Sequence, residues 1–90
     1  MTSGHARVIV VVALALCGST ASAQPAERAA AREHYSRGEQ HYRQGDFTRA
    51  LAEYKRALAL RKDPAFVFNI AQCHRQLGQE KEALFYYRLY

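Results

Sequence analysis

Residues 38–54 read GEQHYRQGDFTRALAEY, and residues 71–87 read AQCHRQLGQEKEALFYY. A shift of 33 residues superposes the two stretches. Five positions then carry the same residue: His41 and His74, Gly45 and Gly78, Ala50 and Ala83, Leu51 and Leu84, Tyr54 and Tyr87. Gly38 also meets Ala71, and Tyr35 meets Phe68. A period of this length is typical of stacked helical hairpins, in which each unit buries its apolar face against its neighbours.

Four helices are expected around these repeats. After a polar lead at residues 24–26, good helix formers predict a first helix from Glu27 to Gln44, which Gly45 ends. Asp46 is an N-cap candidate for a second helix, Phe47 to about Leu60. Asp63-Pro64 predicts the start of a third helix that runs to Leu77, and a fourth begins near Gln79 and continues to Tyr90. No window alternates as a strand does, so the fold class is all-α.

The spacing within each copy resembles the tetratricopeptide repeat, whose pattern is W-x2-L-G-x2-Y, then A-x3-F, then P. The first copy offers His34, Arg37, Gly38, His41, Ala50 and Tyr54, and the second offers Val67, Ile70, Ala71, His74, Ala83 and Tyr87. The opening aromatic and the tyrosine are replaced, Pro64 comes two residues late, and the period is one residue short. The resemblance implies two helix-turn-helix hairpins, with repeat 1 at residues 31–63 and repeat 2 at residues 64–90. The alternative is a generic four-helix bundle.

In this family the first helices of successive repeats line a concave groove that receives an extended peptide or a partner's helix. The resemblance places eight residues on that groove: Arg32, Tyr35, Glu39, Tyr42, Phe68, Asn69, Gln72 and Arg75. Asn69 matches the asparagine that binds the ligand backbone in peptide-clamping members. Tyr35 and Glu39 stand where that clamp has lysine and asparagine, so its capture of a free C-terminal carboxylate is not expected. The alternative is that these eight residues are ordinary solvated polar groups.

The first 23 residues have the composition of a secretory signal peptide. Arg7 is the only strong base before Glu27, residues 8–17 are all apolar, and the run ends at Ala21-Ser22-Ala23. This order predicts export, cleavage after Ala23 and a periplasmic location. Residues 24–30 would then be a polar lead-in and the start of the first helix. An uncleaved membrane anchor is the alternative, although the apolar stretch is shorter than the ~20 residues that a span needs.

Cys17 and Cys73 are the two cysteines of the chain. Lipidation of Cys17 is a further alternative, but the residue before a lipidated cysteine is usually small, and Leu16 is not. If Cys17 leaves with the signal peptide, Cys73 has no partner for an intramolecular disulfide. Cys73 is then expected to be a small buried residue on a helix, and a reactive thiol or an intermolecular bridge is the other possibility.

No catalytic or metal-binding constellation emerges from the residues. His34 and His41 are two helical turns apart, ~10 Å, which is too far for one ion, and His41 and His74 are expected to be packed imidazoles. Cys73 and His74 point ~100° apart on a helix, so they cannot form a nucleophile–base pair. Ser36 has no helix neighbour that could act as its base, because its i+4 residue is Gln40 and its i−4 residue is Arg32. We therefore expect no cofactor and no enzymatic activity. An enzyme that uses Cys73 or the histidines is the weaker alternative.

The net charge is +5, or +4 without Arg7, and acids lie among scattered bases along the chain, which is typical of a solvated helix surface. A protein or peptide partner is expected rather than nucleic acid, and an acidic peptide or an anionic envelope component is compatible with this charge. Phe85, Tyr86, Tyr87, Leu89 and Tyr90 crowd the last helix. Because repeat arrays usually need ~3 units and a polar cap, residues 80–90 are expected to bind a second copy or to continue into a longer array.

Overall fold

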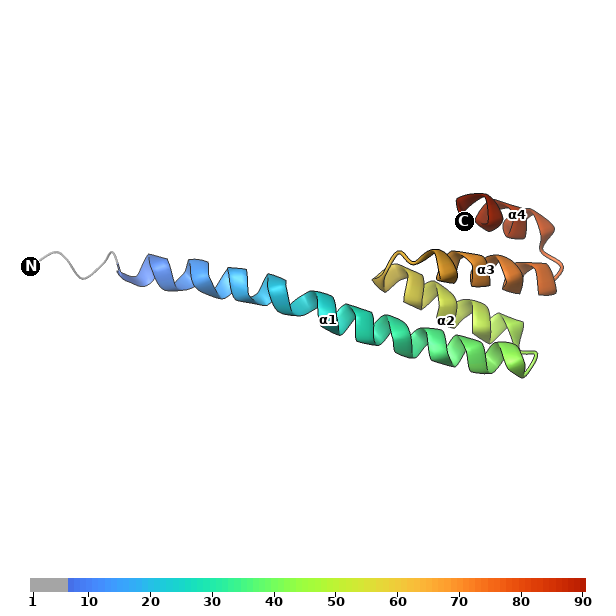
Figure 1. The fold of residues 1–90 in the computed structure, drawn as a ribbon, viewed down its shortest axis with the longest axis horizontal. Coiled ribbons are helices and arrows are strands. Elements are labelled where there is room, and N and C mark those ends of the chain that lie inside the picture. The colour runs from blue at the N-terminus through green and yellow to red at the C-terminus, as the bar shows by residue number, and fades with distance from the viewer. Residues whose placement is uncertain (1–6) are drawn as a thin grey trace, which may run out of the picture.

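The computed structural model describes the backbone of residues 7–90 and the side chains of residues 24–90. It contains helices α1 (Arg7–Arg43), α2 (Phe47–Leu60), α3 (Pro64–Gln76) and α4 (Glu80–Leu89), and residues 7–90 include no strand. The all-α prediction is confirmed. Figure 1 shows α1 extending far beyond the body that the other three helices form.

The helices pair in chain order as two stacked hairpins. α1 packs against α2, α3 packs against α4, and α2 and α3 form the contact between the hairpins (Figure 1). α2 is therefore covered on two sides, whereas α4 packs chiefly on α3. This is the predicted arrangement of two helix-turn-helix units.

Both hairpins close with the same turn. Gly45 has a φ of 78° and Gly78 a φ of 75°, a left-handed conformation that glycine adopts without steric cost. The backbone N–H of Asp46 donates to the His41 carbonyl, and that of Gln79 donates to the His74 carbonyl, each at 2.9 Å. These bonds satisfy carbonyls at the C-terminal ends of α1 and α3, and both predicted glycine stops are confirmed.

The close crossing inside the first hairpin depends on Gly38. A Cβ added there would lie 2.7 Å from Cε1 of Tyr54, so only glycine allows α1 to approach that ring. Tyr54 is 1% exposed and Ala50, Ile70 and Cys73 are fully buried around it. The predicted role of a small residue at position 38 is thus confirmed, and Ala71, its counterpart in α3, is also fully buried.

Aspartates cap the two central helices as expected. The Asp46 carboxylate accepts a hydrogen bond from the Arg49 backbone N–H at 3.1 Å. The Asp63 carboxylate accepts one from the Ala65 backbone N–H at 2.9 Å, and Pro64 occupies the first position of α3. These bonds satisfy backbone donors that the helix itself leaves free, and they fix where α2 and α3 begin.

The helix ends differ slightly from prediction. α1 ends at Arg43 and α3 at Gln76, each one residue earlier than expected, and α4 spans Glu80–Leu89. The larger difference is at the start of α1, because the expected polar lead at residues 24–26 is helical and α1 continues through Pro25. Ala-rich sequence on both sides of Pro25 favours the helix, although proline removes one backbone hydrogen bond.

The predicted signal peptide, residues 1–23, lies outside the side chains that the structure describes. Within the described part of the chain, no helix combines the length and the hydropathy that a membrane crossing requires.

Candidate functional site

One face of α1 carries a stripe of large side chains that meets residues of α3 in two hollows. Arg28, Arg32, Tyr35, Glu39 and Tyr42 follow one another at intervals of four and three residues, so they share one side of the helix. Two hollows lie along this side, one at each end of the stripe. We call this surface the α1–α3 face.

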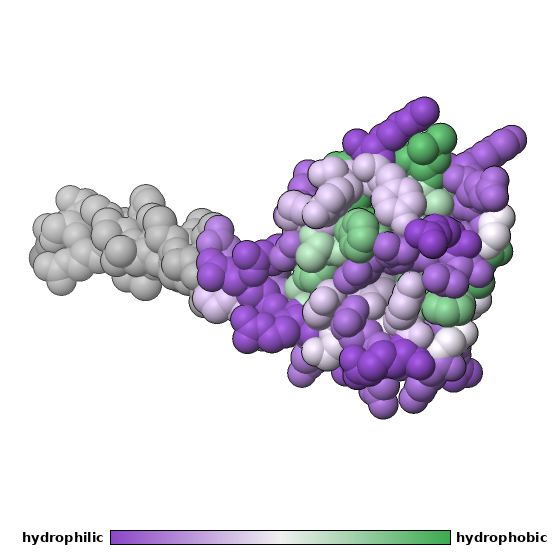
Figure 2. Space-filling view, turned by 45° about the vertical axis from the view of Figure 1, so that its right-hand side comes forward, coloured by the Kyte–Doolittle hydropathy of each residue, from purple (hydrophilic) through white to green (hydrophobic). Residues whose placement is uncertain are grey.

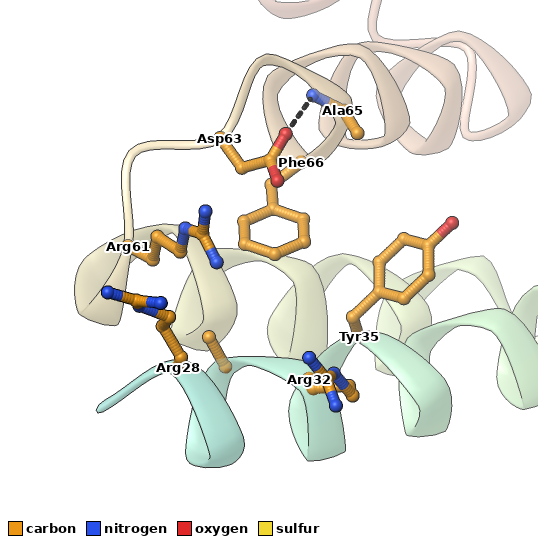
Figure 3. A pocket seen from close by; sticks show the side chains of 8 residues that line it. Arg28, Arg32, Tyr35, Arg61, Asp63, Ala65 and Phe66 are labelled. Carbon is orange, nitrogen blue, oxygen red and sulfur yellow. Dashed lines mark hydrogen bonds between the residues drawn. The ribbon is translucent and has the colours of Figure 1, made fainter. Parts of the chain in front are cut away.

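The first hollow has a volume of about 390 Å³ and is named the arginine hollow. It lies where the C-terminal end of α2 and the N-terminal end of α3 meet α1. Its lining residues are Arg28, Ala31, Arg32, Tyr35, Arg61, Asp63, Ala65 and Phe66. In Figure 3 the side chains of Arg28 and Arg61 approach from different helices, and the Phe66 ring lies beside them.

The aromatic part of this hollow is firmly packed. The ring centroid of Tyr35 is 5.5 Å from that of Phe66 and 5.9 Å from that of Tyr54. Phe66 is only 7% exposed, and it forms a small core with Ala31 and Ala57. The hollow therefore has a rigid apolar floor with arginine side chains at its rim.

The second hollow, of about 280 Å³, is named the polar hollow. It is lined by Glu39, Tyr42, Tyr54, Phe68, Asn69 and Gln72. The Tyr54 hydroxyl donates a hydrogen bond to the Glu39 carboxylate, and burial together with this bond raises the pKa of Tyr54. Asn69 and Gln72 line the hollow from α3, and both residues are half-buried. Amide side chains in such a position can donate to and accept from a peptide backbone.

Seven of the eight predicted groove residues line these two hollows, Arg32 and Tyr35 the first and Glu39, Tyr42, Phe68, Asn69 and Gln72 the second. Arg75, the eighth, is exposed near the end of α3 and lines neither of them. Phe68 also contacts α4, with its ring centroid 6.0 Å from that of Tyr87 and 5.3 Å from that of Tyr90.

The sequence did not identify Arg28, Arg61 or Phe66 as site residues. Arg28 could have been found, because it precedes Arg32 by one helical turn on the same face. Arg61 and Phe66 could not, because they join the site only through the turn between α2 and α3.

A charged cluster around the buried Glu53 joins the two helices of the first hairpin away from this face. Glu53 accepts from His34 Nδ1 at 2.7 Å and from an Arg56 guanidinium nitrogen at 2.9 Å. The hydrogen bond from His34 is the main cause that lowers the pKa of Glu53, with the charges of His34 and Arg56 adding to it, while burial opposes the shift. These bonds join α1 to α2, so we assign the cluster to the fold rather than to a reaction.

The remaining candidates for chemistry are packed into the core. Cys73 is fully buried, and its burial is the main cause that raises the pKa of its thiol to about 12. His74 is 5% exposed, lies stacked on Tyr86 and contacts the Gln79 side chain at 2.7 Å. The predictions of a buried Cys73 and a packed His74 are confirmed, and His41 is half-buried. Among the described side chains no three of the His, Cys, Asp and Glu type converge as metal ligands do.

Comparison with protein families gives two matches, both described as tetratricopeptide repeat. One covers residues 31–64 and the other residues 65–90, so together they span both hairpins. Neither the comparison with curated proteins nor that with solved structures found a match.

Proposed function

The chain belongs to the tetratricopeptide-repeat family, whose repeats generally mediate protein–protein interaction, and from this we propose that it binds an extended peptide segment of a partner protein. The binding surface is the α1–α3 face, and no catalysis is involved. The observation that carries the proposal is the alignment of the arginine hollow and the polar hollow along one side of α1.

The two hollows complement each other as parts of one peptide site. Extended peptides expose backbone N–H and C=O groups, which Asn69 and Gln72 can satisfy in the polar hollow. The arginine hollow, with Tyr35 and Phe66 at its floor, has room for a side chain. Because the rings of Phe66 and Tyr54 in the two hollows are already packed, with 7% and 1% exposure, ordering them on binding should cost little.

The test is selection of random peptides displayed on phage against the chain, followed by affinity measurement on the selected peptides. The double variant Asn69→Ala and Gln72→Ala should weaken binding about tenfold or more, since backbone hydrogen bonds are lost. The matched control is Thr48→Ala and Lys55→Ala, both exposed on α2. Equal binding by the double variant and the control would contradict the proposal, as would failure to enrich any peptide.

The proposed location is the bacterial periplasm, after cleavage behind Ala23. The exit sequence Ala21-Ser22-Ala23 supports this, and so does Pro25, which is inside α1 in the uncut chain. Cleavage would leave Pro25 as the second residue of the mature protein, where its missing N–H costs the helix nothing. Mass spectrometry of the exported protein should show Gln24 at the N-terminus, and retention of Met1 would contradict the proposal.

A second candidate function is self-association through α4, which would place a second copy of the chain on its outer side. Four large side chains of this region are well exposed: Leu84, Phe85, Leu89 and Tyr90 are 49, 57, 58 and 66% exposed. Figure 2 shows apolar side chains gathered in patches among hydrophilic ones on the body of the molecule. Surface of this kind is stabilised when it is covered, by about 25 cal/mol per Å².

Light scattering over a range of concentrations separates this candidate from the first. Association that disappears in a Phe85→Lys and Leu89→Lys variant would support the second candidate, while peptide binding on the α1–α3 face should remain. A monomer at all concentrations would exclude it.

A further inference from the structure

From the charge distribution along the α1–α3 face we infer that the arginine hollow is a carboxylate-binding subsite, which anchors one Asp or Glu side chain of the bound peptide and sets its register. The inference rests on the proposed function and adds the chemical class of the ligand to it. Three arginines line the hollow, Arg28 and Arg32 from α1 and Arg61 directly after α2. Figure 3 shows Arg28 and Arg61 close together and Arg32 one turn further along α1.

These three arginines have no acidic partner in the described part of the chain. The ion pairs found among the described side chains use other bases, namely His34, Arg37, Arg49 and Arg56. Three like charges at one rim repel one another, and a bound anion would relieve that repulsion. Guanidinium groups also match a carboxylate geometrically, because they can donate two parallel hydrogen bonds to it.

The two acids near the hollow do not fill this role. Asp63 forms part of the wall, and its carboxylate accepts from the Ala65 backbone N–H at 2.9 Å as the cap of α3. Glu27 lines a smaller neighbouring hollow with Arg28 and Arg61, but it forms no ion pair with either within 4.0 Å. The arginine side chains therefore remain available to an external anion.

The aromatic floor favours a peptide over an isolated anion. Phe66 and Tyr35 lie next to the arginines, so an aliphatic part of an acidic side chain, or its neighbour, can rest on the rings while the carboxylate meets the rim. A volume of about 390 Å³ suits one or two side chains. The continuation of the stripe toward the polar hollow gives the rest of the peptide a path.

The negative charge of Glu39, further along α1, is expected to determine which peptide residue occupies the arginine hollow. Glu39 follows Arg32 by seven residues, or about 10 Å along α1 at ~1.5 Å per residue. An extended peptide covers this distance in about three residues at ~3.3 Å each. A peptide with an acid in the arginine hollow is therefore expected to avoid a second acid about three positions away, where it would meet the Glu39 carboxylate.

The experiment uses the phage-displayed random peptides introduced above, selected in parallel on the chain and on its Arg28→Gln and Arg61→Gln double variant. Peptides selected on the unchanged chain should be enriched in Asp or Glu at one position and depleted of both three positions away. Enrichment of acids should disappear on the double variant. A Lys81→Gln and Arg88→Gln variant, which removes the same charge from α4, should select the same peptides as the unchanged chain.

Affinities of the selected peptides then test the contact directly. Replacing the enriched Glu by Gln, or the Asp by Asn, should weaken binding to the unchanged chain about tenfold and leave binding to the Arg28→Gln and Arg61→Gln variant little changed. Melting by circular dichroism checks that the variant is folded, and an Arg28→Lys and Arg61→Lys variant, which keeps the charge, should retain part of the affinity.

Two results would overturn the inference. Selected peptides that lack acidic residues, or that bind the arginine variant equally well, would leave the proposed function intact but remove the carboxylate subsite. Vesicles containing phosphatidylglycerol that bind the unchanged chain and not the arginine variant, while peptide affinities stay equal, would assign the arginines to a lipid surface instead. Failure to enrich any peptide would remove the proposed function and this inference together.

Discussion

The second helices of the two hairpins, α2 and α4, carry the same repeat residues and yet differ in burial. In α2, Ala50, Tyr54 and Ala57 are at most 1% exposed, because α1 covers one side and α3 the other. In α4 only Ala83 is buried, while Tyr87, the counterpart of Tyr54, is half-buried, and Tyr90, the counterpart of Ala57, is 66% exposed at the end of the helix. The comparison shows that the repeat sequence determines the hairpin, whereas the helix of the following repeat determines how deeply the second helix is buried.

The largest expected effect comes from truncating the tyrosine that both copies share. Tyr54→Ala should cost about 3–5 kcal/mol of unfolding free energy, since it opens a cavity and leaves Glu39 without its donor. A domain of this size has little more than that in total, so the variant should be largely unfolded. Urea titration followed by circular dichroism measures the effect.

Tyr87→Ala is the matched change in the second copy. Because Tyr87 is only half-buried, it should cost about 1 kcal/mol. Equal losses of unfolding free energy in Tyr54→Ala and Tyr87→Ala would mean that α2 is not more deeply buried than α4.

The helix crossing provides the next comparison. Gly38→Ala should destabilise by about 1–3 kcal/mol although alanine favours helix, because its Cβ would lie 2.7 Å from the buried Tyr54 ring. Ala71→Leu in the second hairpin should cost a similar amount through overpacking at a fully buried position. Thermal melts report both, and a Gly38→Ala protein more stable than the parent would disprove the close approach.

The pH dependence of stability tests the bond that joins α1 to α2. The pKa of Glu53 is lowered in the folded state, so its ionised form stabilises the fold above the unfolded pKa, near 4.5, and this contribution is lost as the pH falls through the folded value. Glu53→Gln should lower stability at neutral pH by about 1–3 kcal/mol and flatten the acid limb of the curve. If the stability of the parent and that of the Glu53→Gln variant fell equally steeply with decreasing pH, the stabilising role of the ionised Glu53 would be contradicted.

The smallest effect is expected on α4. Phe85→Lys and Leu89→Lys, each on an exposed position, should change the unfolding free energy of the monomer by less than about 0.5 kcal/mol. Urea titration at low protein concentration is the measurement. A loss comparable to that of Tyr54→Ala would place these side chains in a core.

The fold was predictable because the sequence signals that specify it are either local, at turns and helix starts, or repeated in both hairpins. Gly45 and Gly78 mark the turns, Asp46 and Asp63 mark the helix starts, and the shared spacing indicates the hairpins. The start of α1 was not predictable. Proline is usually found at the beginning of a helix or just beyond its end, whereas Pro25 lies within α1.

For the candidate site, the sequence could predict only which residues share a face of the same helix. Seven residues that line the two hollows were among the eight placed on α1 and α3 by the family resemblance. Arg61 and Phe66 join Arg28 only because the C-terminal end of α2 and the N-terminal end of α3 pack against α1. The contact of His34 with Glu53, 19 residues apart, depends in the same way on how α1 lies against α2. Such contacts have no signal in the spacing of the sequence.

The most direct measurement is a nuclear magnetic resonance titration of the chain with an acidic peptide selected as above. We expect the backbone amide shifts of Arg28, Arg32, Asn69 and Gln72 to change together and to saturate at one peptide per chain. Those of Lys81, Phe85 and Leu89 should stay unchanged. Changes confined to α4, or spread evenly over the four helices, would contradict peptide binding on the α1–α3 face.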